Sequence, residues 1–221
     1  MKSLKDFFNT LTDADLFRGI TPDVLGPLLD CIDARLRNVR KGKFILAAGD
    51  KPDFIGIVLS GQLHIIRDDY DGNRSIIASV TQGQIFAEAL SCAGVSESPV
   101  TVFAAADSTV MLMTFSGIIQ SCPNCCSYHR DLIGNLLRLI ANKNLILQNR
   151  MEIIELKSVR EKVLLYLESF PQKKGRSITI PFNREEMADF LNVERSALSH
   201  ELAKMKKDGL IEYQKNSFIL K

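Results

Sequence analysis

Residues 183–208, NREEMADFLNVERSALSHELAKMKKD, have the pattern of two short helices joined by a tight turn. Asn183 can cap the first helix because its side-chain oxygen can accept a backbone N–H, and Glu186 holds the capping-box position three residues later. Asn192 suits the left-handed conformation in which helices often end. Glu194 stands at the start of the second helix, where an acidic side chain complements the helix dipole. The stretch therefore predicts a helix-turn-helix.

The second helix of this stretch has one apolar and one polar face. Leu198, Leu202 and Met205 recur at intervals of four and three residues, as core positions of a helix do. Such a helix can lie in a DNA major groove, with donor side chains at base edges and lysines at phosphates. On spacing alone, a small helical hairpin with a solvated charged face is an equally good interpretation. The predicted DNA-contacting residues are Arg195, Ser196, Ser199, His200, Lys204, Lys206 and Lys207.

Strand patterns on both sides of the two helices favour DNA binding. Residues 178–182 (ITIPF) suit a short strand, and residues 209–221 (GLIEYQKNSFILK) suit two strands around a Lys215-Asn216 turn, which together predict a winged helix. The pattern IPFNREEMADFLNVERSALSHELAKMKKDGLIEYQKNSFIL resembles the C-terminal domain of the CRP/FNR family of bacterial transcription regulators. The resemblance implies that Arg195, Ser196, Ser199 and His200 meet bases. That family often has Glu and Arg where Ser196 and His200 stand, so a different target site is implied.

Length, composition and charge fit such a regulator. A chain of 221 residues suits one or two domains, and 46% hydrophobic residues allow a substantial core. The sequence shows neither a signal peptide nor an apolar run of membrane-spanning length, so we expect a cytoplasmic protein with no membrane contact. The net charge of +2 argues against a generic binder of polyanions. From Ser158 onward there are 12 basic and 9 acidic residues, against 16 and 17 before it, so the positive excess lies in the predicted DNA-binding part.

Catalytic and disulfide patterns are missing from the sequence. No Ser/His/Asp set, paired carboxylates or P-loop is recognisable, which argues against an enzyme. The five cysteines are an odd number without a secretory signal, which argues against a disulfide framework.

The N-terminal half changes from helical to strand periodicity. Residues 3–17 and 22–33 have the pattern of short amphipathic helices. From Asn38 onward, apolar segments recur between glycine-bearing turns, which predicts a β-roll or jelly roll and an α+β fold for the whole chain. The expected strand segments are KFILAAGD, DFIGIVLSGQ, LHIIRDDYDGN, RSIIASVTQGQ, VTVFAAADS and TVMLMTF, with a hairpin turn at Asp71-Gly72.

This half also resembles the CRP/FNR family, in its sensor domain related to cyclic-nucleotide-binding domains. The resemblance lies in LFRGI, KGKFILAAGD, IGIVLSGQLHI, DGNRSIIASVTQGQIFAEAL and SPVTVFAAADSTVMLM, and with the C-terminal match it covers nearly the whole chain. It implies a sensor domain over residues 1–122, a dimerisation helix over 123–156 and a DNA-binding domain over 157–221.

The resemblance places an effector pocket but argues against cyclic AMP. Family members that bind cyclic AMP hold its phosphate with an Arg ten residues after a Glu, beside oriented N–H groups. Here Ala87 stands where Gly is typical before Glu88, and Ser98 stands where the Arg is expected. The alternative is that Glu88 is a structural carboxylate and no ligand binds. The pocket positions implied by the resemblance are Phe86, Ala87, Glu88, Ser98, Pro99, Leu145 and Ile146.

Other sensor chemistries have weaker support. A second sensor type of the family carries an iron–sulfur cluster on N-terminal cysteines, but no cysteine precedes Cys31. Cys122, Cys125 and Cys126, with His129 nearby, contain one C-x-x-C pair that could bind metal or act as a thiol couple. A turn before a helix with half-buried cysteines is the favoured interpretation, and we predict no metal site. Haem binding through His64 or His129 is the least favoured alternative. The effector stays unidentified.

Residues 124–156 predict one long helix with a wide apolar face. Ile133, Leu137, Ile140, Leu147, Met151 and Ile154 fit a heptad frame, and Leu132, Leu136 and Leu139 widen that face. We expect the leucine-rich face to meet the sensor domain and an asparagine-bearing edge to lie at a twofold seam, although solvated asparagines are an equally good interpretation. The predicted seam residues are Asn135, Asn142, Leu145 and Asn149.

The sequence thus predicts a homodimeric, sequence-specific transcription regulator that binds double-stranded DNA. Its further partners would be a small-molecule effector and, for an activator, RNA polymerase. A competing class is a cyclic-nucleotide-type binding module that regulates a protein partner and uses its winged helix for protein contact.

Overall fold

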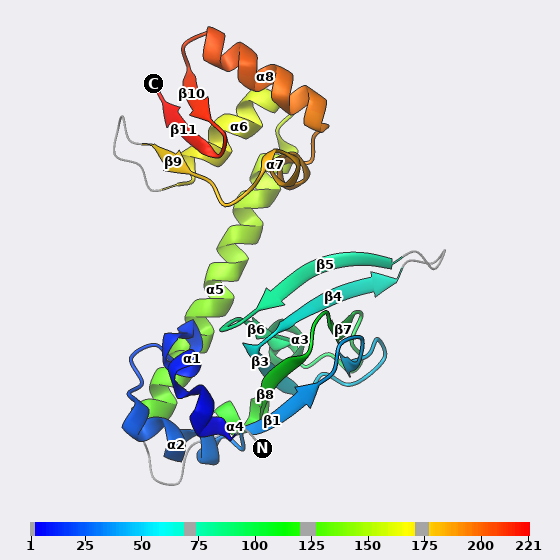
Figure 1. The fold of residues 1–221 in the computed structure, drawn as a ribbon, viewed down its shortest axis with the longest axis vertical. Coiled ribbons are helices and arrows are strands. Elements are labelled where there is room, and N and C mark those ends of the chain that lie inside the picture. The colour runs from blue at the N-terminus through cyan, green and yellow to red at the C-terminus, as the bar shows by residue number, and fades with distance from the viewer. Residues whose placement is uncertain (1–2, 69–73, 120–126, 171–176) are drawn as a thin grey trace. The chain divides into compact units, whose positions relative to one another are not determined.

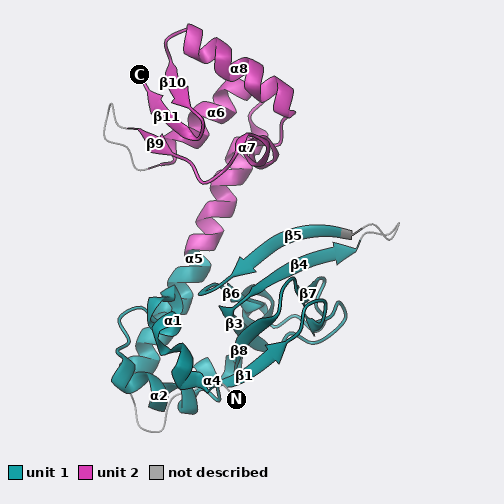
Figure 2. Cartoon of the chain, in the orientation of Figure 1, with its two compact units in different colours: residues 1–141 teal, residues 142–221 magenta. Residues whose placement is uncertain are grey.

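The computed structural model describes residues 3–68, 74–119, 127–170 and 177–221. The chain forms two compact units, residues 1–141 and 142–221, and the division falls inside helix α5 (Ser127–Glu155) (Figure 2). The finer domain limits expected from the sequence stay a prediction. Within the described ranges, no helix combines the length and apolar character needed to cross a bilayer.

The first unit contains two antiparallel four-stranded sheets. Their strand orders are β1-β8-β3-β6 and β2-β7-β4-β5. Buried side chains from both sheets, such as Val58, Leu63 and Val110, form one apolar cluster between them. The predicted β-roll is confirmed. The strands are β1 (Arg35–Val39), β2 (Phe44–Leu46), β3 (Phe54–Ser60), β4 (Gln62–Asp68), β5 (Arg74–Thr81), β6 (Ile85–Phe86), β7 (Thr101–Ala104) and β8 (Ser108–Thr114).

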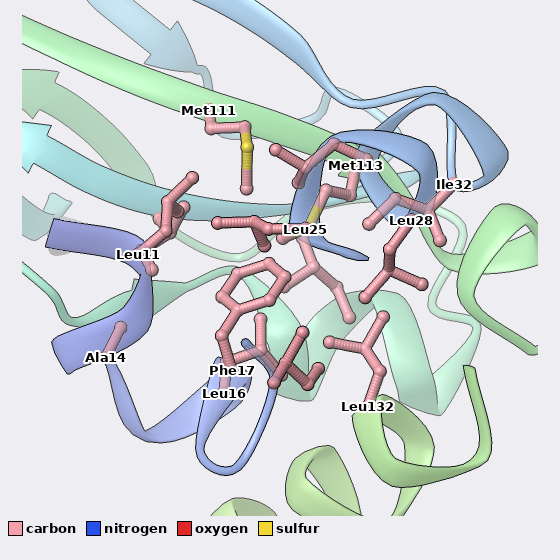
Figure 3. Packing of buried hydrophobic residues seen from close by; sticks show 14 of the residues in the cluster. Leu11, Ala14, Leu16, Phe17, Leu25, Leu28, Ile32, Met111, Met113 and Leu132 are labelled. Atoms are coloured by element: carbon pink, nitrogen blue, oxygen red, sulfur yellow. The ribbon is translucent and has the colours of Figure 1, made fainter. Parts of the chain in front are cut away.

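Helices from both ends of this unit cover the first sheet. Figure 3 shows Leu11, Phe17 and Leu25 from the N-terminal helices packed with Met111 and Leu132. Leu132 and Leu136 of α5 are buried in this cluster and Leu139 packs against it, so this part of the predicted leucine-rich face meets the sensor unit, whereas Leu137 is 62% exposed. The helical elements are the 3-10 helices η1 (Leu4–Phe7) and η2 (Asp15–Phe17), and the α-helices α1 (Phe8–Asp13), α2 (Pro22–Cys31), α3 (Glu88–Ala93) and α4 (Phe115–Ile119).

The second unit is a winged helix, as the sequence predicts. Three helices pack on a three-stranded sheet of order β10-β11-β9 (Figure 1). Met187 and Leu191 share the core with Leu198, Leu202 and Phe218, all with 0% exposure. The elements after α5 are α6 (Val159–Glu168), β9 (Ile178–Thr179), α7 (Arg184–Leu191), α8 (Arg195–Lys207), β10 (Ile211–Gln214) and β11 (Ser217–Leu220).

Candidate nucleic-acid interface and effector site

Local interactions define both ends of α7, the helix before the turn that leads into α8. The Asn183 side-chain oxygen accepts the N–H groups of Glu185 and Glu186 at 2.9 and 3.0 Å. The Glu186 carboxylate accepts the Asn183 N–H at 2.7 Å, which completes the predicted capping box. Asn192 ends α7 with φ of 52°, in the predicted left-handed conformation.

A buried lysine fixes the same turn from α6. Lys162 is 7% exposed, and its Nζ donates to the carbonyl oxygen of Leu191 at 3.1 Å and of Asn192 at 3.5 Å. The last carbonyls of a helix lack intrahelical partners, and a cation is favoured at this end of the dipole. Lys162 is not among the residues predicted from the sequence. A signal was present, because Lys162 lies four residues before the buried Tyr166 and so shares a face of α6 with it.

The exposed face of α8 carries the predicted base-reading residues. Arg195, Ser196, Ser199 and His200 are exposed, while Leu198, Leu202 and Met205 are fully buried. The four exposed residues have spacings of one, four and five, which place them on one side of a helix. Lys204 and Lys207 are exposed farther along α8, where they can reach phosphates.

One arginine ties α6 to α8. Arg160 donates from Nε to Glu201 at 2.6 Å and from Nη2 to Asp208 at 2.7 Å. Hydrogen bonds with Glu201 first and Asp208 second raise the pKa of the Arg160 guanidinium. Glu201 lies in the middle of α8 and Asp208 follows its last residue, so the two ion pairs attach α8 to α6 at two points. Sequence spacing carries no indication of them, because the partners lie 41 and 48 residues away.

The wing packs around two cations. Arg184 lies 5.3 Å above the ring centroid of Tyr213 and donates to the Lys215 carbonyl oxygen at 3.3 Å. Burial lowers the pKa of Arg184. Lys206 Nζ lies 5.4 Å from the Tyr213 centroid, so this predicted phosphate contact sits beside the wing. A hollow of about 530 Å³ lies there, lined by Ser177, Lys206, Glu212, Tyr213, Gln214, Ser217 and Ile219.

The predicted effector positions before α3 are buried. Phe86 is 1% exposed and Glu88 is 6% exposed, and Ala87 between them has φ of 62°. Ser98, at 3% exposure, donates its hydroxyl to the Val100 carbonyl oxygen at 2.7 Å. The Ser98 hydroxyl therefore serves its own loop, while Pro99 is exposed.

The remaining predicted pocket residues belong to the second unit. Leu145 and Ile146 of α5 are 56% and 61% exposed. Their position in an effector pocket stays a prediction.

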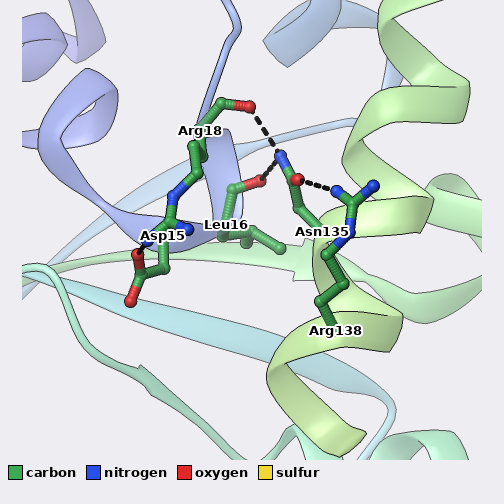
Figure 4. A network of polar contacts seen from close by, with 5 residues as sticks. All are labelled: Asp15, Leu16, Arg18, Asn135 and Arg138. Atoms are coloured by element: carbon green, nitrogen blue, oxygen red, sulfur yellow. Dashed lines mark hydrogen bonds and ion pairs between the residues drawn. The ribbon is translucent and has the colours of Figure 1, made fainter. Parts of the chain in front are cut away.

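Asn135 differs from the other predicted seam residues. It is 5% exposed, and its amide donates to the carbonyl oxygens of Leu16 at 3.1 Å and Arg18 at 2.8 Å (Figure 4). Its side-chain oxygen accepts a hydrogen bond from Arg138 at 3.0 Å. The side chain is thus committed to its own chain, where it ties α5 to η2 and to the residue that follows η2. Of the four predicted residues, Asn142, Leu145 and Asn149 are the exposed ones.

Cys122, Cys125 and Cys126 lie outside the described residues. Among the described residues, no three His, Cys, Asp or Glu side chains gather closely enough to hold a metal ion.

Comparisons with known proteins agree with this architecture. The cyclic nucleotide-binding domain family matches residues 36–122, and the Crp-like helix-turn-helix domain family matches residues 162–221. No curated protein is detectably similar in sequence.

Solved structures share the fold of the whole chain. DNR from Pseudomonas aeruginosa is 19% identical with a TM-score of 0.52, over 100% of this chain and 96% of DNR. CprK, solved as its OCPA complex, is 13% identical with a TM-score of 0.61, over 89% of this chain and 88% of CprK. The c-di-GMP-responsive regulator CLP of Xanthomonas campestris is 14% identical with a TM-score of 0.51, over 88% of this chain and 98% of CLP.

Proposed function

The chain belongs to the CRP/FNR family of transcription regulators, and from this premise we propose how its DNA-binding activity is carried out and controlled. In this proposal, α8 of two copies meets two half-sites of one operator, under the control of an effector other than cyclic AMP.

The exposed donor face of α8 is the observation that carries the DNA-reading part. Arg195 can donate two hydrogen bonds to a guanine edge, and Ser199 or His200 can meet neighbouring base edges or phosphates. The Arg160 ion pairs and the Lys162 hydrogen bonds fix α8 and the preceding turn on α6. A rigid support favours base reading, because side chains on a fixed helix lose less freedom on binding.

An exposed apolar surface on α5 supports a dimer. Leu137, Leu145, Leu147 and Met151 are each between 56% and 62% exposed. Leu137, Leu147 and Met151 also fit the heptad frame, and such a stripe on a helix is typical of a helix that packs against another helix. A twofold dimer would present two recognition helices about 34 Å apart, which is about one turn of DNA. Asn142, Leu145 and Asn149 are the proposed seam residues.

The charge around Glu88 supports an effector other than cyclic AMP. Residues 85–100 contain Glu88 and Glu97 but no Lys, Arg or His. A cyclic phosphate carries a negative charge and would need a cation or several oriented donors here. The segment of Phe86, Ala87 and Glu88 that we propose for the effector therefore suits a neutral or apolar ligand instead.

Selection of DNA from a random library tests the reading of DNA. The full chain should enrich a two-part sequence with half-sites about 10 base pairs apart. A failure to retard any DNA would support the alternative, a module that regulates a protein partner. If the selected site activates a promoter in a reconstituted assay, RNA polymerase is the expected second partner.

Thermal unfolding tests the effector separately. A ligand that binds only the native state raises the midpoint of thermal unfolding. We expect cyclic AMP not to bind, so cyclic AMP at millimolar concentration should leave this midpoint unchanged. A raised midpoint with cyclic AMP would overturn the effector part without touching the DNA part.

A further inference from the structure

A thiol and an imidazole meet where α2 contacts the start of α5. Cys31 is the last residue of α2 and is exposed, whereas His129 on α5 is only 5% exposed. Cys31 Sγ lies 3.8 Å from His129 Nδ1, and His129 Nε2 lies 2.5 Å from the Ile118 carbonyl oxygen. The pair belongs to the first unit and includes no residue of α8 or of the segment around Glu88, so neither the proposed DNA interface nor the proposed effector positions include it.

The Ile118 contact decides which nitrogen of His129 carries the proton. A carbonyl oxygen can only accept a hydrogen bond, so neutral His129 must hold its proton on Nε2. Nδ1 then presents a lone pair toward Cys31, and the thiol is the donor across 3.8 Å. If the thiol proton passes to Nδ1, both N–H groups of the imidazolium keep a partner: Nδ1 faces the thiolate and Nε2 faces Ile118.

We propose that Cys31 and His129 form a thiol–imidazole pair that makes Cys31 a site of oxidation by hydroperoxides. The thiolate is the nucleophilic form of cysteine, and a neighbouring histidine base is one way to generate it. Cys31 is an exposed residue, which favours its reaction with a small peroxide from solvent. Buried His129 is held in place by Ile118 and supplies the base.

The oxidation balances in protons and electrons. The Cys31 thiolate attacks one peroxide oxygen, so that an S–O bond forms and the O–O bond breaks. The departing hydroxide or alkoxide takes the proton from His129 Nδ1. The products are Cys31 sulfenic acid, neutral His129 and water or an alcohol. The sulfur has lost two electrons and the peroxide has gained them.

Cys92 provides an internal contrast in the same unit. It is half-buried on α3, and burial, followed by the charge of Glu88, raises the pKa of its thiol. A raised thiol pKa leaves less thiolate at neutral pH, so Cys92 should react slowly there.

Site-resolved sulfenic acid trapping tests the pair in the full chain. The reduced protein is treated with hydrogen peroxide and dimedone, and adducts are quantified by mass spectrometry after trypsin digestion. Residues 19–35 form a tryptic peptide in which Cys31 is the only cysteine. The initial rate on this peptide is measured at pH 6.5 and at pH 8.5.

The pH dependence distinguishes a paired from an ordinary thiol. An ordinary cysteine, with a pKa near 8.5, changes its thiolate fraction by about 50-fold between these pH values. We expect the wild-type rate at Cys31 to change by less than about 10-fold, because His129 takes up the proton. An absent adduct on residues 19–35, or a wild-type change of about 50-fold, would overturn the proposal.

His129→Gln is the matched variant. Its side-chain amide can still donate to the Ile118 carbonyl oxygen, but it offers no base to Cys31. The rate on residues 19–35 should regain the steep dependence of about 50-fold. The same shallow profile in wild type and His129→Gln would exclude His129 as the base. If the variant fails to fold, the wild-type profile alone decides.

Discussion

The Lys162 ammonium of α6 donates to the carbonyl oxygen of Leu191, the last residue of α7, over 3.1 Å. It also lies 3.5 Å from the Asn192 carbonyl oxygen in the turn before the recognition helix. Because Lys162 is only 7% exposed, these carbonyl oxygens replace the water molecules that would otherwise solvate its ammonium group. The turn is therefore fixed by a residue from outside the two-helix motif.

Replacing Lys162 by Met should destabilise the winged helix and weaken operator binding. Met keeps much of the apolar stem but leaves the two carbonyl groups without their charged donor. Hydrogen bonds to charged groups contribute about 1.5–3 kcal/mol, so the free energy of unfolding should fall by about that amount. Urea denaturation and operator titration measure the two effects. Lys204→Met, at an exposed position, should leave the stability unchanged, and equal stability losses in both variants would contradict the role of Lys162.

The buried Tyr166 phenol should lower the free energy of unfolding at alkaline pH. Burial raises the pKa of its phenol to about 12, from an ordinary value of 10.0. A raised pKa in the folded state means that the stabilisation is complete below pH 10 and is lost as the pH rises toward 12. The free energy of unfolding should therefore fall over this window, and Tyr166→Phe should reduce the fall.

The same variant has an expected effect at neutral pH. The Tyr166 hydroxyl is buried without a hydrogen-bond partner in the ranges that the structure describes. Removing an unsatisfied buried hydroxyl is neutral or stabilising, so Tyr166→Phe should gain up to about 1 kcal/mol at pH 7. A loss of more than about 1 kcal/mol would show that the hydroxyl is satisfied. Chemical denaturation at pH 7 and at pH 11 separates the two effects.

Local signals explain why the helix-turn-helix could be predicted from the sequence. The capping box of Asn183 and Glu186 and the left-handed Asn192 involve neighbours within a few residues. The apolar spacing of Leu198 and Leu202 is likewise local, and the structure confirms each of these features. Periodicity and turn residues were enough for this part.

Features that depend on distant partners could not be predicted. The Arg160 ion pairs and the Asn135 bonds to Leu16 and Arg18 join residues at least 41 positions apart. Strand β1 was not among the predicted strands, because Val39 is its only buried residue and the alternating pattern is absent. Sequence spacing carries no record of which polar group a distant side chain will meet.

Asn135 predicts a stability effect that is independent of dimer formation. Asn135→Ala removes the donor for two carbonyl groups, of which the one on Leu16 belongs to a fully buried residue. An unsatisfied buried acceptor costs about 1–3 kcal/mol, so thermal and urea unfolding should show a loss of that size.

Asn9→Ala is the matched control for this prediction. Asn9 is exposed on α1 and lies outside the proposed dimer seam, so its replacement should leave the stability of the chain close to that of wild type. Sedimentation at several concentrations should show the same dimer dissociation constant for Asn135→Ala as for wild type. A larger dimer dissociation constant for Asn135→Ala than for wild type would indicate that Asn135 contributes to the dimer seam.

Replacing Ala87 by Gly should cost less stability than an ordinary Ala-to-Gly substitution in a helix. Its φ of 62° lies in the left-handed region, which costs a non-glycine residue roughly 1–2 kcal/mol. Ala87→Gly relieves that cost but loses a buried methyl group worth about 0.8 kcal/mol. Ala89→Gly, at an exposed position in α3, should cost about 0.5–1 kcal/mol. Urea unfolding should therefore find Ala87→Gly the more stable variant, and the opposite order would contradict strain at Ala87.

Arg195 and Lys207 should differ in how they affect DNA binding. Arg195 is exposed at the start of α8 and is proposed to read a base edge, so Arg195→Ala should cost about 1–3 kcal/mol and relax the preference at one base position. Lys207, at the other end of α8, is placed for a phosphate. Lys207→Ala should weaken all sequences alike and reduce the slope of log affinity against log salt by about 1.

Titration of operator and scrambled DNA at several salt concentrations separates the two roles. Lys41→Ala, an exposed lysine in the first unit, should change neither the affinity nor the salt slope. If Arg195→Ala weakens operator and scrambled DNA equally, Arg195 contacts the backbone instead of a base. Base reading would then rest on Ser196, Ser199 and His200, because these are the remaining exposed polar side chains of the predicted base-reading set.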